Sequence, residues 1–160
     1  AESCQDELSN AVALLSASLM LPNLPTLIVY DIHSMIGLIR ESQTGPSSAI
    51  QSYLKAFWIA SATEDIPPVQ VALTIHRLGR AYHLNGTWQQ GKALLAKAIQ
   101  IYEEHNLSRE PCMAEAKEMI QECEQAIKTS KMKWSSMRFG FGQLSLIKEE
   151  QETSERRSSH

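Results

Sequence analysis

Three basic side chains lie on one face of a predicted helix near the middle of the chain. His76, Arg80 and His83 are spaced four and three residues apart, so they are neighbours on a helical surface. Two imidazoles at this spacing are potential metal ligands. Arg80 places a cation between them, however, and no nearby cysteine or carboxylate completes a set of three or more ligands. We therefore predict no metal site, and the face is either a solvated polar surface or a surface that contacts a ligand.

No motif in the sequence indicates catalysis. The segment FGFG at 139–142 is neither GxGxxG nor preceded by a strand, so it predicts no phosphate-binding loop. No serine or cysteine lies in a strand-turn-helix elbow. Asn85 and Asn106 fall at predicted helix ends, where asparagine commonly caps a helix or forms a turn. We expect no enzymatic activity and no cofactor, with an enzyme whose site joins residues distant in the sequence as a remaining alternative.

Length and composition predict one domain with an ordinary hydrophobic core. The chain has 160 residues, of which 43% are hydrophobic, and a formal net charge of −3. This charge provides no overall field that attracts nucleic acid or an anionic membrane. Three cysteines without a CxxC pair argue against a disulfide framework or a thiolate zinc site. A reducing, cytoplasmic location fits this cysteine usage best.

An apolar stretch near the N-terminus, residues 11–21, is neither a signal peptide nor a membrane span by its pattern. Its upstream flank is acidic rather than basic, and Pro22 ends it at about half the length that a membrane requires. We therefore predict no transmembrane segment. The first residue is not Met, which leads us to expect a processed chain or part of a longer chain or assembly.

A short basic and aromatic tract, residues 128–142, is a second candidate binding segment. Lysines and an arginine alternate there with Trp134 and two phenylalanines, a composition that can bind RNA or an anionic membrane. One short tract is a weak signal, and such runs are often solvated or packed on their own domain. We favour the interpretation that Trp134, Met137 and Phe141, spaced three and four residues apart, cover the exposed end of a helical array.

Hydrophobic spacing of three to four residues predicts an all-α chain of six helices. Proline, glycine and polar residues punctuate the pattern: Pro46, Pro68 and Pro111 suit a first helical turn, and Gly86 suits the residue after a helix end. The predicted helices span residues 4–20, 26–42, 46–63, 68–85, 88–105 and 111–129. The short connections require neighbouring helices to be antiparallel.

The chain also matches itself when shifted by 42 residues. Lys55 falls on Lys97, Ala56 on Ala98, and Gly37 on Gly79. Glycine within a helix costs about 1 kcal/mol relative to alanine. Its recurrence at the same position therefore predicts that both glycines allow another helix to approach closely. For Gly79 that helix is the following one, through Gly91, Leu95 and Ala98.

These residues resemble a known repeat. LGRAY at 78–82, followed by NG at 85–86 and then by Gly91, Leu95 and Ala98, is similar to a tetratricopeptide repeat. The 42-residue period resembles the longer repeats of kinesin light chains. Arg40 stands where the later repeat has Tyr82, and Gly91 replaces the usual alanine. The resemblance implies an α-solenoid of antiparallel helix pairs in which the first helix of each pair lines a concave groove.

The resemblance, together with the predicted helices, implies this organisation. Residues 1–25 hold an N-terminal helix from a preceding or degenerate repeat, 26–130 the repeats with a capping helix, 131–147 the basic and aromatic segment, and 148–160 a disordered tail without apolar residues.

The implied function is that of a scaffold that binds a peptide or helix of a protein partner of mixed charge. The alternative is a structural spacer or a subunit of a larger assembly. The resemblance places Asp31 and Ser34 in the groove. The candidate binding residues are Leu38, Glu41, Leu73, His76, Arg80, His83, Leu84, Glu115, Glu118 and Glu122. We expect His76 and His83 to add positive charge as the pH falls toward about 6.5.

Overall fold

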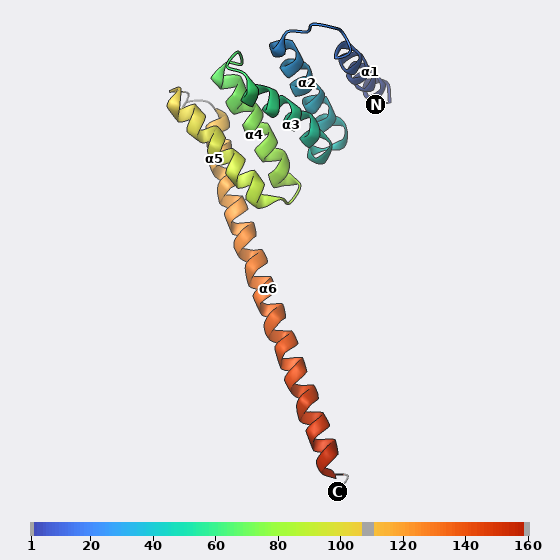
Figure 1. The fold of residues 1–160 in the computed structure, drawn as a ribbon, viewed down its shortest axis with the longest axis vertical. Helices are drawn as coiled ribbons and strands as arrows, with labels where there is room; N and C mark the ends of the chain where they lie inside the picture. The colour runs from blue at the N-terminus through green and yellow to red at the C-terminus, as the bar shows by residue number, and fades with distance from the viewer. Residues whose placement is uncertain (1, 107–110, 159–160) are drawn as a thin grey trace. The chain divides into compact units, whose positions relative to one another are not determined.

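The computed structural model describes the backbone of residues 2–106 and 111–158 and the burial of residues 4–106 and 111–134. Within these ranges the backbone forms six helices and no strand (Figure 1). The helices are α1 (Glu2–Ser18), α2 (Thr26–Thr44), α3 (Pro46–Ala62), α4 (Pro68–Leu84), α5 (Trp88–Glu104) and α6 (Pro111–Ser158). The chain divides into two compact units, residues 1–124 and 125–160. The predicted all-α fold class is confirmed.

Proline and glycine limit the helices where the sequence predicted. Pro46, Pro68 and Pro111 are the first residues of α3, α4 and α6, because proline lacks an N–H that the first turn does not use. Gly45 and Gly86 follow α2 and α4 with φ angles of 94° and 77°, in the region that glycine enters without steric cost. Every predicted boundary lies within two residues of the structure except the end of α6.

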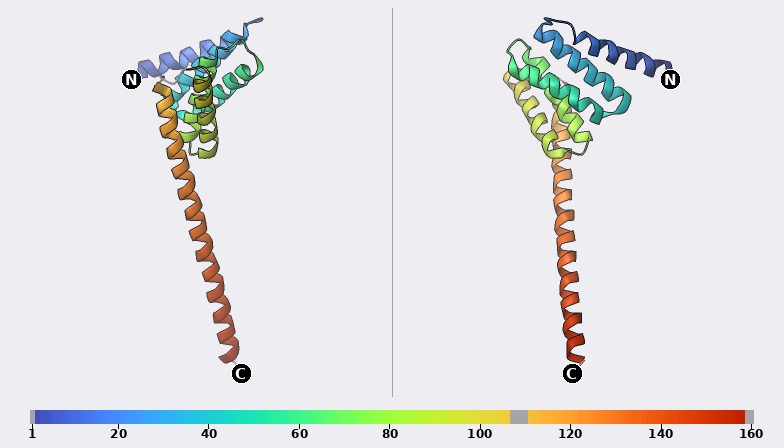
Figure 2. Two further views of the ribbon diagram at one scale, coloured as in Figure 1. Left: turned by 90° about the vertical axis from the view of Figure 1, so that its left-hand side faces the viewer. Right: turned by 45° about the vertical axis from the view of Figure 1, so that its right-hand side comes forward.

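The helices form two equivalent pairs in the first unit. α2 packs against α3 and α4 against α5, and the two pairs meet where α3 contacts α4. Figure 2 shows these neighbours side by side in two further views. Thr26 and Pro68 begin equivalent helices 42 residues apart, as do Pro46 and Trp88. The 42-residue repeat of the sequence is therefore a repeat of the structure.

Glycine makes the close helix contacts that the repeat predicted. A Cβ atom added at Gly79 would lie 2.9 Å from Cγ of Leu95, and one at Gly91 would lie 2.9 Å from the backbone nitrogen of His83. In the preceding pair, a Cβ atom at Gly37 would lie 2.6 Å from Cδ1 of Tyr53. Tyr53 and Leu95 are also 42 residues apart, so both glycines accept a large side chain of the following helix.

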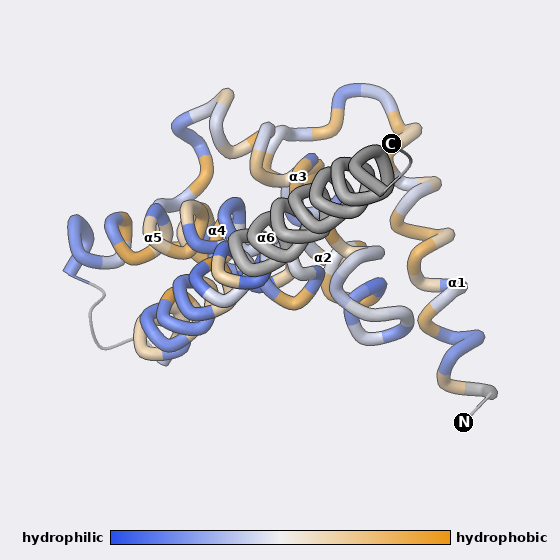
Figure 3. The backbone as a smooth tube through the Cα atoms, turned by 90° about the horizontal axis from the view of Figure 1, so that it is seen from below, coloured by the Kyte–Doolittle hydropathy of each residue, from blue (hydrophilic) through white to orange (hydrophobic). Residues whose placement is uncertain are grey.

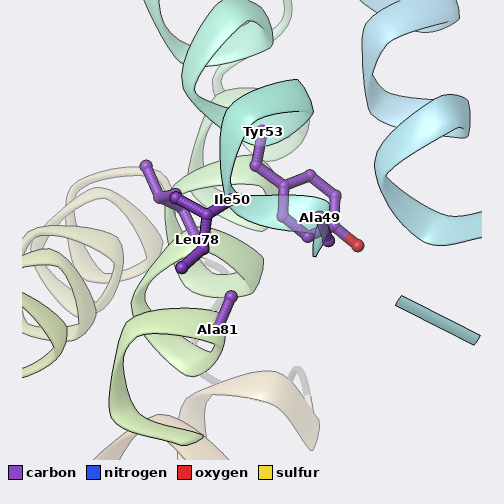
Figure 4. Packing of buried hydrophobic residues seen from close by; sticks show 5 residues of the cluster. All are labelled: Ala49, Ile50, Tyr53, Leu78 and Ala81. Atoms are coloured by element: carbon purple, nitrogen blue, oxygen red, sulfur yellow. The ribbon is translucent and has the colours of Figure 1, made fainter. Parts of the chain in front are cut away.

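Buried clusters hold the helices of the first unit together, and two of them join one pair to its neighbours. Figure 4 shows the first, in which Ala49, Ile50 and Tyr53 of α3 meet Leu78 and Ala81 of α4. The second joins α4 and α5 to the start of α6 through Ala72, Ile75, Ala98, Tyr102 and Met113. The core therefore runs from one pair to the next, as a stack of helix pairs requires.

The last helix extends further than the sequence predicted. α6 continues from Pro111 to Ser158, past residue 129 and through most of the stretch expected to be disordered. Gly140 and Gly142 each cost about 1 kcal/mol in a helix without ending it, and the Glu, Lys, Gln and Arg residues around them favour helix. Trp134 is 73% exposed, so the structure does not support its predicted role as a cover for the helical array. The side chains of Met137 and Phe141 lie outside the described residues.

Polar residues interrupt the apolar ones along the helices. In Figure 3 each helix that carries colour alternates between hydrophilic and hydrophobic stretches. Among the described residues, no helix combines the length and the apolar character that crossing a membrane requires.

Candidate functional site

The first helices of successive pairs form one surface of the first unit. We call this surface, made of α2, α4 and residues 111–124 of α6, the first-helix wall. The Tyr30 hydroxyl on α2 donates a 2.8 Å hydrogen bond to the backbone oxygen of Gln70 on α4. On the other side of α4, Nε2 of His83 lies 2.8 Å from Oε2 of Glu122 on α6. The wall therefore joins helices that are separated by about 40 residues in the sequence.

Arg80 forms an ion pair with Glu41 across α2 and α4. The other oxygen of this carboxylate accepts a 2.7 Å hydrogen bond from the Tyr53 hydroxyl. Burial, together with this hydrogen bond to Glu41, raises the pKa of Tyr53, so the hydroxyl stays a donor. The structure thus brings together two of the predicted groove residues. It does not leave Arg80 as an unpaired cation for a partner.

His76 is buried, which contradicts the prediction that it faces an open groove. Its exposed fraction is 3%, because α6 packs over it and places Oε2 of Glu115 at 3.5 Å from Nε2. Burial lowers the pKa of His76; the nearby Glu115 opposes this shift, whereas Arg80 and Arg77 reinforce it. The expectation that His76 becomes charged near its ordinary value is therefore wrong.

His83 connects two side chains of α6. Nε2 faces the Glu122 carboxylate, and Nδ1 lies 3.3 Å from Sγ of Cys123. With the ring proton on Nε2, Nδ1 accepts the hydrogen of the thiol. Cys123 was not among the residues predicted from the sequence, although its separation from His83 is close to the repeat length and it lies on the buried face of α6.

The order of thiol, imidazole and carboxylate resembles that of a catalytic cysteine with its base. Cys123 is fully buried, however, and burial raises the pKa of its thiol. A nucleophilic cysteine needs access and a lowered pKa, the opposite of both properties. We interpret this chain of contacts as a structural link between α4 and α6. Across the described residues, no group of three or more histidine, cysteine or acidic side chains is placed to hold a metal ion.

The remaining candidate residues differ in their surroundings. Glu118 and Leu84 are exposed, whereas Leu38 and Leu73 line a pocket between α2 and α4. The pocket has a volume of about 320 Å³. Its lining residues are Tyr30, Asp31, Ser34, Met35, Leu38, Gln70, Leu73 and Arg77.

Two buried polar atoms in this pocket's lining have no hydrogen-bond partner. They are Oγ of Ser34, a residue only 8% exposed, and Oε1 of Gln70. A buried polar group without a partner costs about 1–3 kcal/mol. Asp31 and Arg77 add one charge of each sign to the lining. The pocket therefore combines aliphatic side chains with charged ones, a mixture of apolar and polar lining that is typical of binding sites.

The fold defines the class of the chain, an all-α array of helical repeats. A scan against models of protein families found no match, and a search among curated proteins found none either. The resemblance to tetratricopeptide repeats therefore rests on the residues quoted above and on the 42-residue spacing of the helix pairs.

Proposed function

We propose that the chain is a protein-interaction module of the tetratricopeptide type whose first-helix wall binds a peptide or a helix of a partner protein. The observation that carries this proposal is the pocket between α2 and α4, because it combines aliphatic side chains with polar and charged residues. Helical-repeat proteins use the surface of stacked helices in this way. The module has no catalysis of its own.

The charges available to a partner differ from those that the sequence predicted. Glu41 and Arg80 neutralise each other, and Glu122 faces His83. Asp31 and Arg77 at the pocket, and the exposed Glu118, are the charges that support contact with a partner. A partner of mixed charge fits this set, with charge setting orientation and association rate more than total affinity.

The test is selection of peptides from a random phage-displayed library on the full 160-residue chain. Selected peptides are then titrated against Leu38→Lys and against a matched control, Trp58→Lys on α3. Both residues are exposed, so we expect stability to change by no more than about 0.5 kcal/mol in either variant. Leu38→Lys should weaken binding about tenfold, equivalent to about 1.4 kcal/mol. Trp58→Lys should leave binding unchanged.

Two results would contradict the proposal. One is the absence of any peptide that the folded chain binds selectively. The other is an equal loss of affinity in the two lysine variants, since binding would then not involve the first-helix wall.

A second candidate function is that of a subunit in a larger assembly. Leu14 on α1 and Met20 and Leu21 just after it are exposed apolar residues close together in the sequence, and contiguous exposed apolar surface often marks an interface. Sedimentation velocity of the wild type and of Leu14→Lys distinguishes this function. Concentration-dependent self-association that the substitution removes supports it, and a monomer at all concentrations contradicts a role in self-assembly.

A further inference from the structure

Buried residues at the start of α6 follow a seven-residue repeat. Met113, Ala116 and Cys123 are buried in the first unit, and they are spaced three and seven residues apart. They therefore fit the a and d positions of a heptad, which form the contact line between the helices of a coiled coil. The sequence continues this pattern beyond the first unit. The a and d positions from 113 to 144 hold Met113, Ala116, Ile120, Cys123, Ile127, Ser130, Trp134, Met137, Phe141 and Leu144.

The continued pattern reaches a part of α6 where its first large residue is exposed. Trp134, at an a position, is 73% exposed. Figure 1 draws α6 as one helix through this region. Gly140 and Gly142 each lower its stability by about 1 kcal/mol relative to alanine, and helices in water gain most of their stability from packing of an apolar face. We therefore expect this part of α6 to pack against another helix.

The seven-residue spacing indicates a coiled coil rather than contact with a flat surface. An ideal α-helix has about 3.6 residues per turn, so a seven-residue pattern drifts by about 20° around the helix in each heptad. The pattern persists over more than four heptads, from Met113 to Leu144. Residues with this spacing stay in contact with a partner helix when the two helices supercoil around each other.

Charge distinguishes the possible partners of this helix. Residues 128–138, here called the basic end, contain four basic residues and no acidic one. Residues 149–155, the acidic end, contain four glutamates and no basic residue. RNA or an anionic membrane would attract the basic end and repel the acidic end. A second copy of α6 that runs in the opposite direction places each basic end beside an acidic end, whereas a parallel copy places like charges together.

We propose that residues 127–155 of α6 form an antiparallel two-stranded coiled coil with the same residues of a second copy of the chain. The apolar a and d positions from 134 to 144 supply the contact between the two helices, and the opposite charges at their ends set the orientation. The inference is independent of the proposed function, because the first-helix wall takes no part in this contact. It also differs from self-association through Leu14, which lies on α1.

Sedimentation velocity of the full 160-residue chain over a range of concentrations tests the inference. Trp134→Ala is compared with a matched control, Met132→Ala. Both side chains are exposed, by 73% and 66%, and both variants gain the helix propensity of alanine. Position 132 lies outside the a and d positions, however. Trp134→Ala should weaken dimerisation at least about tenfold, which is about 1.4 kcal/mol, and Met132→Ala should leave it unchanged.

Charge reversal tests the orientation of the two helices. In a first variant the four glutamates of the acidic end become lysine: Glu149→Lys, Glu150→Lys, Glu152→Lys and Glu155→Lys. This variant should weaken an antiparallel dimer at least about tenfold, because each basic end then lies beside a second basic one. A parallel dimer would keep like charges together and change little. In a second variant the four basic residues of the basic end also become glutamate, which restores opposite charges and should restore dimerisation to within about threefold of the wild type.

Four outcomes overturn the inference. A wild-type chain that stays monomeric up to about 1 mM forms no such dimer. Dimerisation that Leu14→Lys removes and Trp134→Ala leaves intact would place the contact on α1. Equal weakening by Trp134→Ala and Met132→Ala would indicate an apolar contact without heptad register, and a dimer that the first charge variant leaves unchanged would not be antiparallel. None of the α6 variants lies on the first-helix wall, so peptide binding and dimerisation can fail separately.

Discussion

Gly79 of α4 lies directly against Leu95 of α5. A Cβ atom at position 79 would approach Cγ of Leu95 to 2.9 Å and its backbone nitrogen to 3.1 Å. Leucine could change rotamer, but the backbone nitrogen cannot move without moving α5. The same relationship recurs one repeat earlier, where Gly37 lies against the ring of Tyr53. Close packing thus offsets the low helix propensity of glycine at both positions.

Gly79→Ala should therefore destabilise the protein, although alanine alone would favour the helix by about 1 kcal/mol. Overpacking of a tight contact costs about 1–3 kcal/mol, which makes a net loss the expected result. Urea unfolding measures the change, with the exposed Gln90→Ala on α5 as the control. A rise in stability for Gly79→Ala would contradict the close contact.

Arg80→Glu should lower stability by about 1–3 kcal/mol, because it places a second carboxylate beside Glu41. From the sequence, Arg80 was expected only to line the groove as a partner-binding residue. The double variant Glu41→Arg with Arg80→Glu restores opposite charges and should recover most of the loss. A double-mutant cycle by thermal or urea unfolding measures the coupling. Additive effects of the two single substitutions would show that the ion pair contributes nothing.

Stability should decrease as the pH falls below about 6.5, in part through His76. Burial lowers the pKa of His76 below its ordinary value of 6.5. The unfolded chain then binds the proton more readily, so protonation between the folded pKa and 6.5 favours unfolding. His76→Gln should flatten this dependence in urea unfolding measured from pH 7.5 to pH 5. The lowered pKa of His33 contributes in the same direction, so a smaller dependence should remain.

The exposed His105→Gln is the control for this measurement and should keep the wild-type profile. An unchanged profile for His76→Gln would mean that the imidazole is as free to bind a proton in the folded chain as in the unfolded one.

The three cysteines should react with a thiol reagent at different rates. Cys4 is exposed, Cys112 partly exposed and Cys123 buried, and burial also raises the pKa of the Cys123 thiol. Reaction requires the thiolate and access to it. Ellman's reagent at pH 8 should therefore modify Cys123 last, at a rate that urea increases. Mass spectrometry identifies each modified residue, and rapid labelling of Cys123 in the folded chain would show that α6 opens readily from α4.

The sequence was sufficient to predict the helices of the first unit because single residues within the sequence determine where these helices begin and end. Pro46 and Pro68 cannot occupy a helix interior, and Gly86 ends α4 through its own backbone freedom. Spacing along one helix also identified Gly79 as a packing residue. The end of α6 was not predicted correctly, because the sequence after residue 129 contains no proline that would end a helix. The assignment to the tetratricopeptide family stays a prediction.

The candidate site was harder to predict, since it depends on contacts between helices. Glu41 and Arg80 were both placed in the groove, but their pairing required the register of α2 against α4. His76 lies on the edge of a polar face, and only the position of α6 determines that it is buried. Arg77 and Gln70 were not selected, because they line a pocket that depends on how α2 packs against α4.

Two contacts of the wall, Glu41 with Arg80 and His83 with Glu122, depend on the order of the repeats. Glu41 precedes its partner Arg80, whereas His83, one repeat after Glu41, is a base that precedes the acid Glu122. A gene duplication of residues 68–109 would bring His83 of one copy against Arg80 of the next, two bases. A duplication of residues 26–67 would bring Glu41 against Leu38. In neither duplicated array would an acidic side chain face a basic one at this position. The two repeats are therefore not interchangeable.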